Sequence, residues 1–178
     1  MSMQLVLPDS KYKNSFLQAL DEYLKETNLP STQDLFLLDK EELEKNFFSY
    51  VNKLADESQG KNLPPGYVSH THYWLIDANE FIGRVDIRHS LTENLMRIGG
   101  HIGYDIRPSK RNQGYGKKIL KLAVPKAKAL GLTKVLITCD ETNIASKKII
   151  EANGGVFGNS VEQGEGKPRK LRYWLNLS

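Results

Sequence analysis

Apolar side chains recur every three to four positions over the first third of the chain, a spacing that predicts amphipathic helices. Residues 5–7 are expected to form a short strand, and residues 12–27 form a helix that Asn-Leu-Pro-Ser at 28–31 ends. Asp39 is in position to cap a second helix, which Ser58 to Gly60 end. The apolar stripes of these helices consist of Phe16, Leu17, Leu20, Leu24, Leu43, Phe47, Phe48, Val51 and Leu54.

The apolar spacing then changes to every second residue, which is typical of strands. Residues 68–76 and 81–87 alternate on either side of a polar turn and are expected to pair as a hairpin. Residues 98–106 are expected to form a third strand, whose three glycines indicate a bulge or a close backbone approach.

Helical spacing returns at residues 112–130, where lysines back the apolar stripe and Pro125 predicts a kink. Residues 133–139 are almost continuously apolar, as expected of a strand buried on both faces. A helix at 143–152 and two late strands follow.

Composition fits one globular domain with a single core: the chain has 178 residues, 39% hydrophobic and 26% charged, and one cysteine. No apolar run approaches the roughly 20 residues that span a bilayer. Cys139 lacks a disulfide partner, so a reducing compartment is the simplest expectation. We therefore expect a cytoplasmic protein with no membrane partner.

Charge is divided unevenly along the chain. Residues 1–100 hold 10 basic and 15 acidic groups, a net −5, whereas residues 101–178 hold 15 basic and 6 acidic groups, a net +9. A basic half indicates nucleic acid, a membrane surface or a phosphate-bearing cofactor as partner. The lysines lie mainly on the solvent face of one predicted helix, which disfavours nucleic acid.

Residues 106–116 join the third strand to the lysine-rich helix through two glycines and three cations. Free backbone N–H groups at a helix start attract an anion, and glycine lets a diphosphate approach closely. Arg111 adds a charge that can fork onto phosphate oxygens. The spacing matches neither a P-loop nor a dinucleotide fingerprint. The segment therefore predicts a different kind of phosphate site.

The pattern Arg111-x-x-Gly114-x-Gly116 after Arg107-Pro108 resembles the acetyl-coenzyme A loop of the GNAT superfamily of N-acetyltransferases. Asn143-x-x-Ser146 is similar to the family's N-x-x-[AS] at the start of the following helix, and the two motifs lie at the usual distance from each other. The resemblance covers about residues 81–160. The segments GRVDIRHS and GGHIGYDIRP also resemble a poorly characterised bacterial branch of predicted acetyltransferases.

The resemblance implies an α/β fold of the α+β type, with a mixed, mostly antiparallel twisted sheet, a splayed parallel strand pair and flanking helices. It implies one N-acetyltransferase domain over residues 1–178, in which 1–66 form a helical acceptor-side region. Residues 67–160 would form the acetyl-coenzyme A-binding core and 161–178 a C-terminal strand region.

The activity that the resemblance implies is acetyl transfer from acetyl-coenzyme A to a primary amine, by direct attack in a ternary complex. The acceptor would be a small-molecule or peptide amine, relatives often form homodimers, and neither a metal nor nucleic acid is expected. A non-catalytic coenzyme A-binding sensor or interaction module is the alternative. The implied cofactor-binding residues are Tyr104, Ile106, Arg107, Arg111, Asn112, Gln113, Gly114, Tyr115, Gly116, Asn143 and Ser146.

The sequence indicates the catalytic base and acid less clearly than the cofactor-binding residues. His101 falls where relatives often hold the base, and the usual imidazole pKa of about 6.5 suits that role. Asp105 is the second catalytic candidate and Asp86 a further alternative. Many relatives have a tyrosine acid seven residues after the Asn, but this chain has Ile150. Tyr104, Tyr115 or Tyr173 could take over that role, or the thiolate could leave without a protein acid.

Two further side-chain types are interpreted as structural. Cys139 ends a buried apolar strand, which indicates a core residue. His70 and His72 alternate on a strand with no acid or thiol at ligand spacing, so a metal site is not expected there.

Overall fold

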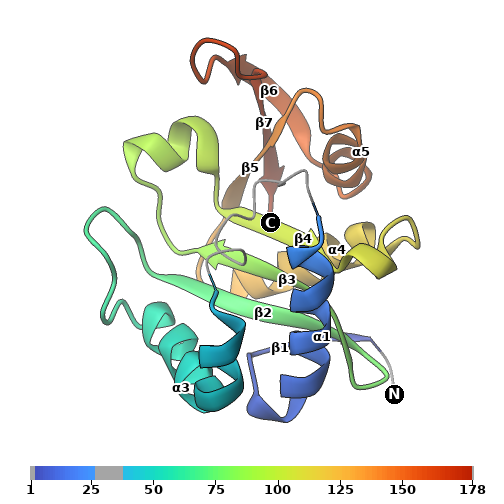
Figure 1. The fold of residues 1–178 in the computed structure, drawn as a ribbon. Helices are drawn as coiled ribbons and strands as arrows, with labels where there is room; N and C mark the ends of the chain where they lie inside the picture. Colours follow the sequence, from blue (N-terminus) through green and yellow to red (C-terminus); the bar gives the residue numbers. More distant parts are fainter. Residues whose placement is uncertain (1–2, 27–37, 178) are drawn as a thin grey trace.

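Two antiparallel sheets meet along one edge and carry helices on their faces in the computed structural model, which describes residues 3–26 and 38–177 (Figure 1). The first sheet has the strand order β1 (Gln4–Val6), β2 (His70–Asp77), β3 (Glu80–Arg88) and β4 (Ile102–Ile106). The second has the order β5 (Lys134–Asp140), β7 (Lys170–Asn176) and β6 (Val156–Val161). This mixed architecture confirms the expected fold class.

Helices cover both faces of the first sheet. The 3₁₀ turn η1 (Ser10–Tyr12), α1 (Lys13–Leu24) and α3 (Lys40–Ser58) pack on one face, and α4 (Tyr115–Ala129) packs on the other. Asp39 caps α3 as predicted, because its carboxylate accepts the N–H groups of Glu41 and Glu42 at 2.9 and 3.2 Å. The predicted helix end at 28–31 lies outside the described residues. None of the described helices has the length and apolarity needed to cross a membrane.

The two faces of the sheet have separate cores because side chains alternate along the strands. On the α4 side, Leu75, Val85 and Ile87 are completely buried. On the α1 and α3 side, Phe16 stacks on Trp74 with ring centroids 4.9 Å apart. Residues of β2 and β3, the strands that precede β4 in the sheet, contribute to both cores.

The predictions for residues 98–101 and for Pro125 were wrong. Leu95–Gly99 form a single turn of π-helix (η2), so β4 begins only at Ile102. Helix α4 continues through Pro125, which lies on its exposed side, where water can bind the freed carbonyl. Among the described helices the irregular residue is Asn46 in α3, with φ −123°.

Strands β4 and β5 converge at one point and then separate. The His101 N–H donates to the Leu136 carbonyl at 2.7 Å, and the Leu136 N–H donates to Nδ1 of His101 at 2.9 Å. The Thr138 hydroxyl adds a hydrogen bond of 2.8 Å to the Ile98 carbonyl. Past this junction the described residues of β4 and β5 share no backbone hydrogen bond, which confirms the expected splayed parallel pair.

Gly100 makes the junction possible. It has φ 72° and ψ −179°, a conformation that only glycine adopts readily, and a Cβ there would lie 2.6 Å from the Leu136 carbonyl oxygen. We expect Gly100→Ala to lower the free energy of unfolding by at least about 1–3 kcal/mol, the cost of the backbone conformation alone.

Chemical denaturation measures this change, with Gly103→Ala as the matched control. A Cβ at Gly103 would meet nothing within 4 Å, so the expected change is below about 1 kcal/mol. Equal losses in both variants would contradict the role of Gly100.

Candidate active site

The separating strands open a cleft of about 820 Å³ between β4, β5 and the first turns of α4 and α5 (Ile144–Ala152). That volume is within the range of cofactor sites. The predicted residues that line it are Tyr104, Asp105, Ile106, Arg111, Asn112, Gly114, Gly116, Asn143 and Ser146. The predicted residues outside its lining are His101, Arg107, Gln113 and Tyr115.

One end of the cleft is built from the start of α4 and is suited to an anion. The backbone N–H groups of residues 112–117 have no acceptor among the described residues. Asn112 and Gly114, with φ 60° and 82°, turn the loop so that successive N–H groups form a concave anion site. Gly116 serves packing, because a Cβ there would lie 2.4 Å from Cδ1 of Ile149.

Two lysines that the sequence analysis did not single out also line this end. Lys117 belongs to α4 and Lys148 to α5, and neither forms an ion pair with a described residue. The lysine-rich stripe of α4 was the only sequence signal for Lys117. Together with the amides, they make this end of the cleft strongly attractive to phosphate.

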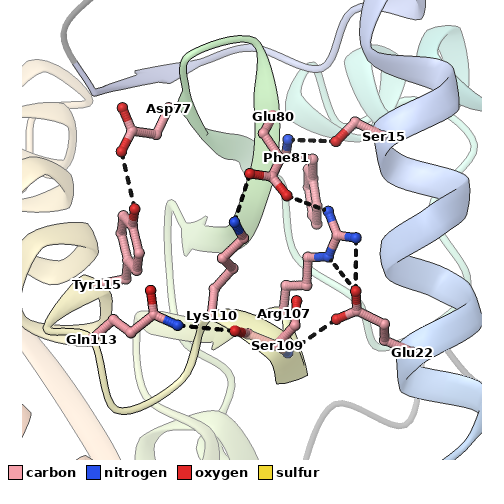
Figure 2. A network of polar contacts seen from close by, with 10 residues as sticks. All are labelled: Ser15, Glu22, Asp77, Glu80, Phe81, Arg107, Ser109, Lys110, Gln113 and Tyr115. Carbon is pink, nitrogen blue, oxygen red and sulfur yellow. Dashed lines mark hydrogen bonds and ion pairs between the residues drawn. The ribbon is translucent and has the colours of Figure 1, made fainter.

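Arg107 holds the loop in place and lies away from the cleft (Figure 2). Its guanidinium donates to Glu22 of α1 at 2.8 Å and to Glu80 at 3.0 Å, and Glu22 also accepts the Ser109 N–H at 3.0 Å. Lys110 pairs with Glu80 at 2.7 Å. The loop is therefore tied to α1 and to the β2–β3 turn, and the Arg107 side chain contacts Glu22 and Glu80 rather than the lining of the cleft.

The Arg111 guanidinium likewise binds a carboxylate, that of Glu26, in the two-pronged geometry that was expected for a phosphate. Its terminal nitrogens contact the two Glu26 oxygens at 2.5 and 3.1 Å, and Nε donates to the Ile106 carbonyl at 2.9 Å. Tyr115 donates to Asp77 at 3.0 Å, away from the cleft (Figure 2). The unpaired donors of this loop are therefore backbone N–H groups, because the Arg111 and Tyr115 side chains are bound to Glu26 and Asp77.

The opposite end of the cleft contains hydroxyl and thiol groups. The Tyr104 and Ser146 hydroxyls are hydrogen-bonded at 2.9 Å, and Asn143 caps α5 by accepting the Ser146 N–H at 2.9 Å. Burial raises the pKa of the Tyr104 hydroxyl and of the Cys139 thiol, so both remain protonated at neutral pH. Ile150 is completely buried in the core.

Backbone alternation in β4 gives the cleft a further donor. The Arg107 N–H donates to the Ile82 carbonyl, and the His101 carbonyl accepts the Arg88 N–H, so odd-numbered residues of β4 pair with β3. The N–H of Tyr104 therefore points to the opposite edge, into the cleft.

Asp105 is the acidic group best placed for proton transfer. Its side chain is buried, Oδ1 lies 3.6 Å from Arg111, and Oδ2 has no hydrogen-bond partner among the described residues. Burial raises the pKa of Asp105, although the positive charges of Arg111 and Arg84 offset part of that effect. The carboxylate is thus a stronger base than an exposed aspartate.

The two other candidates are engaged elsewhere. Nδ1 of His101 accepts the Leu136 N–H, so the ring is neutral with its proton on Nε2, and burial and Arg88 lower its pKa. Asp86 bonds Nδ1 of His72 at 2.6 Å. His101 therefore braces the strand junction.

The histidine pair on β2 has an acidic neighbour that the sequence analysis missed. Glu57 of α3 lies against His70 and His72, although the sequence has no acid at ligand spacing from these histidines. The residues are far apart in sequence, and only the packing of α3 on the sheet brings them together.

Comparisons with known proteins agree with the fold and show the family. A family model described as an acetyltransferase (GNAT) domain matches residues 27–156. No curated protein matches the chain significantly. RimL, a ribosomal L7/L12 alpha-N-protein acetyltransferase solved with coenzyme A, has 18% identity and a TM-score of 0.71, covering 99% of this chain and 94% of its own.

Two other solved structures are similar in fold. A GNAT-family acetyltransferase from Streptococcus pneumoniae is 20% identical, with a TM-score of 0.68 and coverage of 99% of this chain and 100% of its own. A chimera of spermidine N-acetyltransferase SpeG from Vibrio cholerae and hSSAT is 13% identical, with a TM-score of 0.64 and coverage of 99% and 96%.

Proposed function

The chain belongs to the GNAT acetyltransferases, and from that premise we propose that it transfers an acetyl group from acetyl-coenzyme A to a primary amine by direct attack in a ternary complex. The observation that carries the proposal is one cleft with an unpaired amide cradle at one end and a buried carboxylate in its wall. Residues 1–178 act as one domain in this proposal, because Glu22 of α1 and Glu26 just after it anchor the binding loop.

Acetyl-coenzyme A would lie between β4 and β5. The diphosphate contacts the N–H groups of residues 112–117, and Lys117 and Lys148 add positive charge. The Tyr104 N–H donates to the thioester carbonyl oxygen, a kind of contact whose removal costs about 10²–10³ in rate. These contacts explain why the loop exposes its amides and keeps its arginines paired elsewhere.

Asp105 would take the proton from the attacking amine. The carboxylate takes one proton from the ammonium, the freed nitrogen lone pair attacks the carbonyl carbon, and the carbon–sulfur bond breaks. The nitrogen then loses a second proton to the departing thiolate, so the products are the amide and the coenzyme A thiol. The Tyr104 hydroxyl keeps its proton because burial raises its pKa, so it stabilises the leaving thiolate through a hydrogen bond. Tyr104 thereby compensates for the tyrosine that Ile150 replaces.

The acceptor in this proposal is a small-molecule or peptide amine that is drawn as a cation to the buried carboxylate. The loop cations Arg107, Lys110 and Arg111 are paired with glutamates, which supports a cofactor rather than nucleic acid as the polyanionic partner. The exposed side chains of Val156 and Phe157 on edge strand β6 support a homodimer. The lone buried thiol of Cys139 supports a reducing, cytoplasmic location.

Release of free thiol from acetyl-coenzyme A tests the proposal. We expect release that depends on an added amine from a panel of spermidine, an amino sugar and a peptide with a free N-terminus. An N-acetylated peptide without lysine is the control and should give only background release.

Calorimetry with coenzyme A separates the alternatives. Binding without amine-dependent release would favour the non-catalytic sensor over the enzyme. Absence of coenzyme A binding would overturn the cofactor assignment as a whole.

A further inference from the structure

Three side chains converge where the last turn of α3 packs on the start of β2. Glu57 Oε2 lies 2.8 Å from Nε2 of His72 and 3.5 Å from Nε2 of His70. The two histidines are two residues apart on a strand and therefore share its α3-facing side. The three potential ligand atoms all lie within 4.8 Å of one another.

The other nitrogen of each ring is already hydrogen-bonded. Nδ1 of His72 donates to Asp86 of β3 at 2.6 Å, and Nδ1 of His70 donates to the Val68 carbonyl at 2.9 Å. Metal-binding histidines nearly always make such a bond with the nitrogen that does not bind metal, because it fixes the ring and the proton position. Both Nε2 atoms are thereby directed to one point.

The cluster is buried and rich in negative charge. The Glu57, His70 and His72 side chains are 13%, 14% and 10% exposed. The Glu57 and Asp86 carboxylates approach the two ring nitrogens of His72 at 2.8 and 2.6 Å. A cation bound at this point would therefore lie close to two negative charges.

We propose that Glu57, His70 and His72 form a site for a divalent transition metal, with zinc the best match. Two imidazole nitrogens and one carboxylate oxygen are a zinc-binding donor set, with water as the fourth ligand. Bonds of about 2.0–2.1 Å in a tetrahedron place neighbouring ligand atoms roughly 3.3 Å apart. The separations of 2.8 and 3.5 Å from Glu57 lie on either side of that value, and all three ligand atoms lie within 4.8 Å of one another. Calcium and magnesium prefer oxygen ligands and fit poorly.

A metal at this point would fasten the acceptor-side helix to the sheet. Glu57 belongs to α3, the histidines to β2, and Asp86 lies opposite Gly103 of β4, which lines the cleft. The site is separate from the anion cradle at α4 and acts on the stability of the fold rather than on the acetyl-transfer step.

Calorimetric titration of the EDTA-treated full chain with zinc chloride tests the proposal. We expect one zinc ion per chain and a higher melting temperature on binding. Glu57→Gln and His70→Gln should each weaken binding by more than about 100-fold, because each removes a ligand. Asp86→Asn should weaken it by about 10- to 100-fold, the usual cost of losing the partner of a ligating histidine.

His89→Gln is the matched control. This histidine lies next to the cluster and bonds the Thr71 hydroxyl at 2.8 Å, but it is not a ligand, so zinc binding should be unchanged. Melting curves in EDTA show which variants are folded, and cobalt absorption bands report tetrahedral coordination in those that are. Absence of zinc binding by the wild type, or binding that survives Glu57→Gln and His70→Gln, would overturn the proposal.

Discussion

Replacing Asp105 with asparagine is expected to lower kcat/KM for the amine by about 10²- to 10⁴-fold, the usual contribution of a general base. Asparagine has nearly the same shape but accepts no proton from the amine. Arg111 keeps its contacts with Glu26, so the loop and the affinity for coenzyme A should be preserved. Steady-state thiol release and calorimetry measure the two effects separately.

The control for this variant is Asp77→Asn, which removes a carboxylate that bonds Tyr115 outside the cleft. It should retain wild-type turnover. In the wild type, activity should rise with pH as Asp105 loses its proton, and Asp105→Asn should remove that acid limb. An acid limb that persists in Asp105→Asn and disappears in His101→Gln would assign the base to His101.

Replacing Arg107 with methionine is expected to reduce the free energy of unfolding by about 3 kcal/mol. The change leaves Glu22 and Glu80 without the buried guanidinium that joins α1 to the β2–β3 turn (Figure 2). The value lies at the low end for a broken buried pair because the Glu22 side chain is 24% exposed. Chemical denaturation measures the loss, and the KM for acetyl-coenzyme A should rise because the loop loses its anchor.

Lys110→Met provides the comparison, since it removes a second cation from the same Glu80 at a more exposed position. Its expected cost is below about 1 kcal/mol. A loss as large as that of Arg107→Met would contradict the importance of burial in this network.

The same network predicts a pH dependence. Burial by itself would raise the pKa of Glu22, but hydrogen bonds from Arg107 and Ser109 outweigh it and hold the pKa below the usual 4.5. Glu22 therefore contributes stability that is fully present above pH 4.5 and is lost as the pH falls through its lowered pKa. Arg107→Met should show a smaller loss of stability in that acidic range.

Local patterns were sufficient for most of the helices and strands and for the loop whose amides are unpaired. Apolar spacing predicted the helices and strands because each face must bury its side chains, and Asp39 caps α3 as its residue type indicated. The two glycines and the strand-to-helix junction predicted the cradle at residues 112–117, where Asn112 and Gly114 have positive φ angles.

These patterns could not predict contacts between residues that lie far apart in the sequence. The pairing of Arg111 with Glu26 spans 85 positions, and that of His72 with Glu57 spans 15 positions and two elements. The η2 turn replaced the first part of a predicted strand because Gly100 reverses the chain and lets His101 reach Leu136. Which partner a charged side chain finds depends on the assembled fold, and the sequence around it does not reveal this.

The strand order of the second sheet has a consequence for synthesis on the ribosome. Strand β7 lies between β5 and β6. Strand β5, which forms the side of the cleft opposite β4, can therefore pair with β7 only after residues 170–176 have emerged from the ribosome. In a nascent chain that has already formed α1, α3 and the first sheet, β5 still lacks its hydrogen-bonding partner β7. Binding of the acetyl donor is therefore expected only after residues 170–176 have been synthesised and have paired with β5.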